Sequence, residues 1–324
     1  MNQRNDLLLL LLSFALAFVT ALIFIPILKR KKVGQTILKY VELHESKSGT
    51  PTIGGVIFIL PFLVLSFFLL DRQTPLGIIT VVSSVGYAAL GFLDDYLKIR
   101  GGKNMGLRPY QKIIGQGGIA LLIAYFFMTA NPEGRIFVPF FNEYINIGAV
   151  GIFALSLFVL VATTNAVNLT DGLDGLAGSV SAVYFVFLYM LISVMGVAVE
   201  MESFGGIIAT IIGGLLAFLL FNTKKAAVFM GDTGSLFLGS LIATISLFSY
   251  MGFVIAILGI VFVWSAVTVI IQVIYFKITH GKRVFLMTPY HHHLEKKGFA
   301  EPKIVAIYVV ITILVGVILT ISII

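Results

Sequence analysis

The sequence has no cysteine and little charge. It contains 324 residues, of which 11% are Asp, Glu, Lys or Arg, whereas about a quarter are charged in a typical soluble domain. The absence of cysteine excludes disulfides, thiolate nucleophiles, cysteine-ligated zinc and iron–sulfur clusters. Because 59% of the residues are hydrophobic and the mean hydropathy is +1.05, one buried core cannot hide the apolar surface from water. We therefore expect a chain embedded in a membrane.

Two further absences narrow the function. There is no Gly-x₄-Gly-Lys-Ser/Thr loop, so ATP-driven transport has no recognisable motor. No internal repeat is apparent either, whereas secondary transporters are commonly built from inverted repeats that place the substrate site near the membrane midplane. A secondary transporter remains an alternative from a different class, and substrate uptake by reconstituted vesicles without a chemical reaction would support it.

Apolar runs long enough to cross a bilayer are abundant. About 20 helical residues cross roughly 30 Å of hydrocarbon, and we find about ten such runs. Their expected ranges are 6–28, 51–70, 76–93, 112–129, 149–166, 175–194, 204–221, 233–249, 253–276 and 303–323. No small-residue cleavage site follows the first run, which predicts a retained helix. Alternating residues at 135–147 predict a small hairpin. The expected fold class is thus an all-α polytopic membrane protein, with residues 1–324 as a single domain.

The basic residues gather in alternate loops. Of the 22 Lys and Arg residues, all except Arg4, Arg72 and Arg135 lie in or beside the loops after the first, third, seventh and ninth runs. The positive-inside rule makes these loops cytoplasmic, and places both termini and the hairpin outside. Topology and anionic lipid then account for the net charge of +7, so we expect no nucleic-acid partner. A role of some of these residues in holding an anionic substrate stays open.

Five aspartates lie at predicted helix ends on this same side. A carboxylate near the hydrocarbon without a partner costs at least about 2.5 kcal/mol, so such residues usually have a function. Asp94 and Asp95 end the third run, and adjacent carboxylates offer the hard oxygen ligands that Mg²⁺ prefers. An interfacial cap paired with Lys98 is the structural alternative. The other three are Asp171, Asp174 and Asp232.

Two polar segments contain these other aspartates. Amide and acid side chains recur at every third residue at the end of the fifth run, at Asn165, Asn168, Asp171 and Asp174. That spacing gives one polar stripe if the segment is helical. Residues 229–235 lead into the eighth run, where Asp232 is either an N-cap or part of a phosphate site at a helix N-terminus.

Histidines and glycines add polar contacts on the same side. The consecutive residues 291–293 are all histidine and point in different directions, so they do not readily chelate one metal. We interpret them as phosphate or sugar ligands, with a solvated loop as the alternative. Residues 48–55 combine ordinary helix-start chemistry at Thr50 and Pro51 with glycines that allow close backbone approach. Carboxylates with Mg²⁺ beside a bilayer suit phosphoryl transfer to a lipid acceptor.

Together these motifs resemble one family over nearly the whole chain. Asp94–Asp95 and the segments 165–174, 229–235 and 290–293 are similar to the phospho-N-acetylmuramoyl-pentapeptide transferases. These form the bacterial branch of the polyprenyl-phosphate N-acetylhexosamine-1-phosphate transferases. The resemblance implies ten spans with both ends outside, a cytoplasmic active-site cleft in the bacterial cell membrane, dependence on Mg²⁺, and a homodimer.

The resemblance also implies the reaction. Phospho-N-acetylmuramoyl-pentapeptide passes from its UDP-linked precursor to undecaprenyl phosphate, giving lipid I and UMP in peptidoglycan synthesis, and so serving cell wall biogenesis, cell shape and cell division. A sister transferase that uses UDP-N-acetylglucosamine is the nearest alternative. The triple histidine is closer to the muramoyl branch, and a substrate-swap assay distinguishes the two.

Roles for single residues follow from the same resemblance. Asp232 is the expected Mg²⁺ ligand, with Asp94 or Asp95 as a further ligand, and His291 joins these three as a catalytic residue. The expected uridine and sugar contacts are Asn168, Asp171, Asp174, Asn222 and Phe229, the last stacking on uracil. The expected diphosphate or sugar contacts are Lys47, Thr52, Lys98, Lys112, Gln272, His291 and His292. Since the second pKa of a phosphate monoester is about 6, it stays open whether Asp94 deprotonates the lipid phosphate or orients it.

Overall fold

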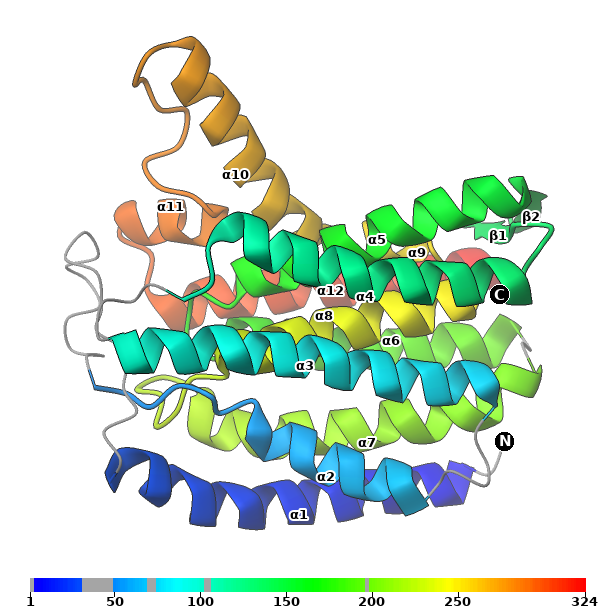
Figure 1. The fold of residues 1–324 in the computed structure, drawn as a ribbon, viewed down its shortest axis with the longest axis horizontal. Helices are drawn as coiled ribbons and strands as arrows, with labels where there is room; N and C mark the ends of the chain where they lie inside the picture. Colours follow the sequence, from blue (N-terminus) through cyan, green and yellow to red (C-terminus); the bar gives the residue numbers. More distant parts are fainter. Residues whose placement is uncertain (1–2, 31–48, 69–73, 102–105, 196–197) are drawn as a thin grey trace.

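The chain folds into a helical bundle with one small hairpin (Figure 1). The computed structural model describes residues 3–30, 49–68, 74–101, 106–195 and 198–324. Its elements are α1 (Gln3–Arg30), α2 (Val56–Phe68), α3 (Pro75–Gly101), α4 (Pro109–Ala130), β1 (Arg135–Val138), β2 (Glu143–Asn146), α5 (Gly148–Thr170), α6 (Leu176–Met195), α7 (Ala198–Asn222), α8 (Gly231–Phe248), α9 (Val254–Leu258), α10 (Ile260–Ile278), α11 (Tyr290–Lys296) and α12 (Glu301–Ile323). In the described part of the chain, 9 helices are long and apolar enough to cross a membrane. A polytopic helical membrane protein is therefore confirmed.

Two of the predicted runs differ from the helices found. The second run was expected from residue 51, but α2 begins at Val56. Residues 51–55 instead bond to the segment before α8, through Gly54 N–H to Phe229 O at 2.7 Å and Phe229 N–H to Pro51 O at 2.8 Å. The ninth run is divided into α9 and α10 at Gly259. A side chain at this position would come within 2.6 Å of Ile255 O, so glycine permits the bend.

The hairpin and both termini lie at one end of the bundle. Arg135–Val138 pairs antiparallel with Glu143–Asn146, which confirms the small hairpin predicted for 135–147. Figure 1 places the two termini beside it, and α11 at the opposite end. Because both termini share an end, the chain passes along the bundle an even number of times, as the sequence predicts.

Helix α8 occupies the centre of the bundle. It packs chiefly against α3 and α5, and every residue in it except Asp232 is buried. Glycines bring the neighbouring helices close, since a Cβ at Gly239 would lie 2.6 Å from Thr164 Cα on α5. Asp232, the residue of α8 that is not buried, lies in the first turn of the helix, at the α11 end of the bundle.

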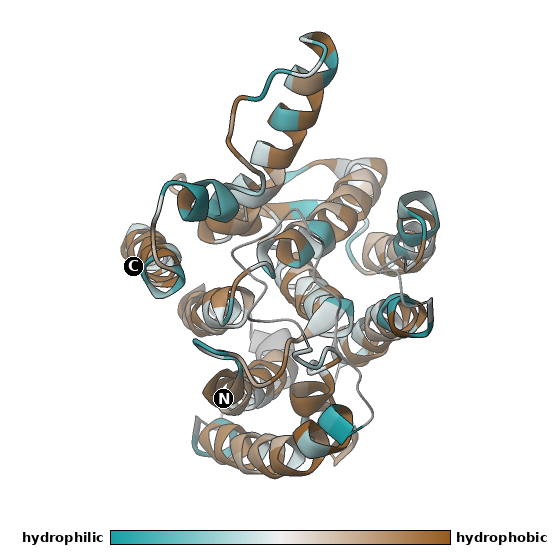
Figure 2. Cartoon of the chain, turned by 90° about the vertical axis from the view of Figure 1, so that its left-hand side faces the viewer, coloured by the Kyte–Doolittle hydropathy of each residue, from teal (hydrophilic) through white to brown (hydrophobic). Residues whose placement is uncertain are grey.

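Helix α10 leaves the bundle at an angle, as Figures 1 and 2 show. Its outer half exposes apolar side chains on all sides, including Ile270, Ile274 and Ile278. Exposed apolar side chains also cover the outer surface of α1, at Leu7 and Leu11 for example. Surfaces of this size and kind suit lipid contact and not water.

Candidate active site

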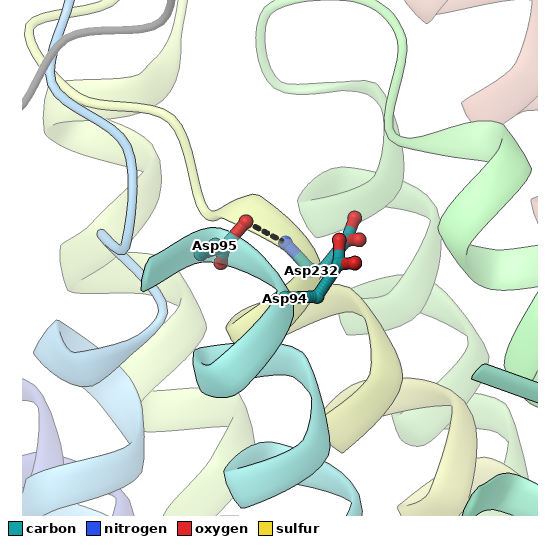
Figure 3. A group of neighbouring side chains, drawn as sticks. All are labelled: Asp94, Asp95 and Asp232. Carbon is teal, nitrogen blue, oxygen red and sulfur yellow. Dashed lines mark hydrogen bonds between the residues drawn. The ribbon is translucent and has the colours of Figure 1, made fainter. Parts of the chain in front are cut away.

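Three carboxylates meet where α3 ends and α8 begins (Figure 3). Asp94, Asp95 and Asp232 each offer one oxygen atom, and these atoms lie within 4.8 Å of one another. Gly91, one turn earlier on α3, makes the approach possible, because a Cβ there would collide with the Asp232 carbonyl group. The structure thus joins two motifs that the sequence analysis found far apart in the chain.

Asp95 holds the start of α8 from the neighbouring helix. It is fully buried. Its Oδ1 accepts from Asp232 N–H at 3.1 Å, and its Oδ2 accepts from Thr233 N–H at 2.9 Å and from Thr233 Oγ1 at 2.7 Å. Free N–H groups at a helix start need acceptors, and α8 has no capping side chain of its own. Asp232 is therefore not the N-cap that the structural alternative supposed; it lies inside the first turn, and Asp95 supplies the cap.

Two lysines offset part of the negative charge of the three carboxylates. Lys98 Nζ lies 2.6 Å from Asp94 Oδ2, 2.8 Å from Asp232 Oδ2 and 3.8 Å from Asp95 Oδ1. Lys112 Nζ, on α4, lies 2.8 Å from the same Asp232 oxygen. The other oxygen of Asp94 accepts from Leu107 N–H at 2.7 Å. Two of the three lysines expected to contact the diphosphate or the sugar, Lys98 and Lys112, are thus at the acidic cluster.

The polar stripe at the end of α5 reaches the same cluster. Asn168 Nδ2 donates to Asp232 Oδ1 and to Ser235 Oγ, both at 2.7 Å, and Asn168 Oδ1 accepts from Lys112 at 3.1 Å. Asp171 follows the last residue of the helix. Burial raises the pKa of its carboxyl well above the usual range, and the negative charges of Asp232 and Asp95 raise it further.

Helix α11 turns two of the three histidines toward this stripe. A Cβ at Gly172 would collide with His291 Nε2 and lie 3.0 Å from His292 Nε2. His292 Nδ1 lies 2.6 Å from Glu295 Oε2. His293 points elsewhere, because its Nδ1 accepts from Leu286 N–H at 3.1 Å. The three rings do not all diverge as expected: the His291 and His292 rings lie side by side, with centroids 4.3 Å apart, and both approach Gly172.

A second group of the predicted residues fastens the loops around the site. Asn222 accepts from Gly175 N–H at 3.1 Å and donates to Val228 O at 2.8 Å. Asp174 accepts from Ala226 N–H at 3.1 Å. These bonds join the loop after α5 to the loop between α7 and α8, which ends at Phe229. The Phe229 side chain is half-buried, and its backbone pairs with Pro51 and Gly54.

Thr52 lies beneath the start of α8. Its side chain is fully buried, and a Cβ at Gly231 would lie 2.7 Å from its Oγ1 and 2.5 Å from Asp95 Oδ2. Gly231 has a φ of +70°, a conformation that favours glycine. The hydroxyl of Thr52 has no hydrogen-bond partner within the described chain.

In the described part of the chain, the side chain of Gln272 bonds to a neighbouring loop and not to the acidic cluster. Gln272 accepts from Val284 N–H and Phe285 N–H, both at 3.0 Å, and donates to Phe285 O at 3.1 Å, so its amide holds the loop that returns from α10. Lys47 lies outside the described residues. No role was predicted for Thr233 or Ser235, although both belong to the motif 229–235 that contains Asp232.

Comparisons with known proteins agree with this geometry. A family model described as glycosyl transferase family 4 matches residues 77–250, which include the acidic cluster and the α5 stripe. The phospho-N-acetylmuramoyl-pentapeptide-transferase of Clostridium botulinum (strain Alaska E43 / Type E3) is 42% identical over 312 residues, covering 95% of this chain and 94% of that protein. The protein of the same name from Listeria innocua serovar 6a is 39% identical over 309 residues, covering 93% and 94%. That from Caldanaerobacter subterraneus subsp. tengcongensis is 38% identical over 305 residues, covering 94% of each chain.

Proposed function

This chain belongs to the phospho-N-acetylmuramoyl-pentapeptide-transferases of glycosyl transferase family 4, and we propose that the cluster of Asp94, Asp95 and Asp232 is where its phospho-sugar transfer takes place. It is a membrane transferase of peptidoglycan synthesis. Its substrates are UDP-N-acetylmuramoyl-pentapeptide and undecaprenyl phosphate, and its products are lipid I and UMP. The names of the relatives do not favour the N-acetylglucosamine alternative. The observation that carries the site is that three carboxylates and two lysines from three helices converge.

Mg²⁺ fits the donor set of this cluster. Carboxylate oxygens are the hard ligands that Mg²⁺ takes, and the three oxygens lie within 4.8 Å of one another. We assign Asp232 as the main ligand and Asp94 as its partner, because backbone N–H groups of α8 hold both oxygens of the fully buried Asp95. Asp94 Oδ2 and Asp232 Oδ2 instead pair with lysine side chains, which can turn toward the substrate. When bound, the ion supplies positive charge for the diphosphate and for the phosphoryl group in transfer.

The chain's own groups position the reacting phosphates. In the reaction an oxygen of the lipid phosphate forms a bond to the phosphorus attached to the sugar, and the bond from that phosphorus to the UMP oxygen breaks. Lys98 and Lys112 are placed to bind the diphosphate oxygens, since ammonium groups make strong hydrogen bonds with phosphate. Asp94 accepts hydrogen bonds on both oxygens, from Leu107 and Lys98, which favours orientation of the lipid phosphate over removal of its proton.

The remaining predicted residues surround the position of the nucleotide and the sugar. Asn168 is bonded to Asp232, and the loop that Asp174 and Asn222 hold ends at Phe229. His291 and His292 approach Gly172, beside Asp171, from α11. We propose that this set holds uridine, the diphosphate and the sugar, with Thr52 and Lys47 on the side of residues 49–55. Gln272 belongs to the proposed diphosphate and sugar contacts, and its amide holds the loop before α11.

The site faces the cytoplasm in this proposal. The basic residues described at the ends of α1 and α3 and before α8 lie at the end of the bundle that holds the acidic cluster and α11, and the positive-inside rule makes that end cytoplasmic. Both termini and the hairpin then lie outside the bacterial cytoplasmic membrane, and the donor meets the lipid acceptor at the inner leaflet. We further propose that residues 1–324 act as one domain and that two copies form a homodimer.

A direct assay tests the function. Purified protein in vesicles receives undecaprenyl phosphate, Mg²⁺ and UDP-muramoyl-pentapeptide labelled in the peptide. We expect UMP and a labelled lipid in equal amounts, and no product from UDP-N-acetylglucosamine. Equal use of UDP-N-acetylglucosamine would support the sister transferase. Accumulation of unchanged donor inside the vesicles without UMP would support the transporter.

A further inference from the structure

The tip of the β1–β2 hairpin exposes two neighbouring phenylalanines. Pairing of Val138 with Glu143 leaves residues 139–142 as the tip, in which Phe140 is 53% exposed and Phe141 is 77% exposed. Phe140 and Asn142 have φ values of +69° and +54°, and this left-handed conformation is unfavourable for a bulky side chain. The fold therefore presents these rings at the end of the bundle away from the acidic cluster, outside the site described above.

The tip is fastened to the rest of the molecule. Asn142 Nδ2 donates to Ser322 O at 2.7 Å, across 180 residues of sequence. At the other end of the hairpin, Phe137 N–H donates to Tyr250 O at 2.8 Å, and the Phe137 side chain is buried. The Arg135 guanidinium lies 4.0 Å from the centre of the Tyr144 ring. The two exposed rings are thus held at a fixed height relative to α12.

Helix α12 sets that height relative to the bilayer. Its 23 residues extend about 34 Å at about 1.5 Å per residue, which is close to the roughly 30 Å of hydrocarbon. Ser322 lies in its last turn, and therefore near the boundary between hydrocarbon and headgroups. The last turns of α12 also face outward with apolar side chains, since Ile318 is 54% exposed and Ile321 is 69% exposed. A tip bonded to Ser322 adjoins a lipid-facing surface at the depth of the interface.

We propose that Phe140 and Phe141 insert into the bilayer interface at this end of the molecule and anchor the hairpin there. Phenylalanine, like tryptophan and leucine, is one of the apolar side chains that interfacial segments bury at this depth, and burying a phenyl ring among lipid chains removes apolar surface from water. The partner is lipid and not a second copy of the chain, because the tip is continuous with the lipid-facing end of α12. The proposal is independent of the transferase function.

Fluorescence of a single tryptophan tests the proposal. The chain has one tryptophan, Trp264, so Trp264→Phe combined with Phe141→Trp places the only indole at the tip. In proteoliposomes at a low ratio of protein to lipid, we expect lipids brominated near the headgroup end of the chains to remove most of its emission. Aqueous iodide should remove little. Leu122→Trp, on the lipid-facing side of α4, and Lys297→Trp, in the exposed turn after α11, give the two reference responses in the same background.

Two results would overturn the proposal. Quenching by iodide as strong as that of the Lys297→Trp reference would place the tip in water. Protection that appears only when the ratio of protein to lipid is raised would assign the tip to contact between copies.

A second variant tests whether Asn142 tethers the tip. Asn142→Gly keeps the left-handed backbone but removes the bond to Ser322. We expect it to weaken the quenching by brominated lipid in the Phe141→Trp protein, and unchanged quenching would reject Asn142 as the tether. Transferase activity of each variant reports whether it is folded.

Discussion

At the scale of single residues, the three aspartates of the cluster have different duties. Asp232 and Asp94 pair with lysine side chains. Both oxygens of Asp95 instead accept hydrogen bonds from the backbone of α8 and from the Thr233 hydroxyl. A buried carboxylate that caps a helix stabilises the fold and fixes whatever the first turn carries. Loss of Asp232 and loss of the Asp95 cap are therefore expected to affect the protein in different ways.

Asp232→Asn is expected to abolish transfer and leave the protein folded. The amide keeps the size of the side chain, and its one oxygen can still accept a hydrogen bond from Lys98, but the substitution removes the charge that we propose binds Mg²⁺. We expect kcat to fall by at least about 10²-fold with an unchanged thermal midpoint. UMP release and thermal unfolding in the same detergent are the measurements, and wild-type turnover would reject the metal assignment.

Thr233→Val tests the cap supplied by Asp95. Valine keeps the shape of threonine but removes the hydroxyl that donates to Asp95 at 2.7 Å. We expect a loss of about 1 kcal/mol in stability and a fall in kcat with little change in KM for the UDP-sugar, because Asp232 is misplaced while the substrate loops are intact. Thr233→Ser retains the donor and should behave like the wild type. If both variants lost activity equally, the hydrogen bond from the Thr233 hydroxyl to Asp95 would not be what positions Asp232.

At the scale of elements, close contact between α3 and α8 assembles the site. Gly91 lies against the backbone of Asp232, and a Cβ there would also be 2.7 Å from Thr233 N. Gly86, on the same helix, has only Ile119 side-chain atoms within reach, the nearest at 3.4 Å. The two glycines thus form a matched pair, one at the site and one away from it.

Gly91→Ala should therefore damage the site, and Gly86→Ala should not. Pushing α8 away from α3 is expected to cost about 1–3 kcal/mol of stability and about 10²-fold in activity, the effect of moving a reacting group by about 1 Å. Parallel measurements of thermal midpoint and UMP release check both variants. Normal activity in Gly91→Ala would mean that the helix contact does not set the geometry of Asp232.

Sequence patterns located most elements but not the contacts between them. Long apolar runs and their flanking charges were enough to place the helices within a few residues, since each crossing must satisfy its own backbone. Two features depend on neighbours distant in sequence. They are the backbone hydrogen bonds of residues 51–55 to 228–230, and the break at Gly259. The site motifs were found because carboxylates near the hydrocarbon are rare. The capping role of Asp95 escaped notice because its partner Thr233 is 138 residues away.

At the scale of the whole molecule, the two ends of the bundle differ in chemistry. The acidic cluster, α11 and the basic loops lie at one end, and the hairpin and both termini at the other (Figure 1). The proposed function requires the first end to face the cytoplasm. Orientation in the membrane is therefore a property that the function depends on.

The absence of cysteine makes this orientation easy to measure. Single cysteines placed at Glu133, beside the hairpin, and at Lys296, on α11, have no background thiol. A membrane-impermeant maleimide added to intact spheroplasts is expected to label Glu133→Cys, and to label Lys296→Cys only after the membrane is opened. The reverse pattern would place the acidic cluster outside and contradict the proposed use of a cytoplasmic donor.

The division of duties among the aspartates is tested most directly by locating the ion itself. A crystal structure of the protein with Mn²⁺ in place of Mg²⁺, and with UMP bound, gives an anomalous signal at the metal. The account predicts that the signal lies beside Asp232 and Asp94, with Asp95 still bonded to Thr233. A metal held by other residues, or by an Asp95 that has left α8, would contradict it.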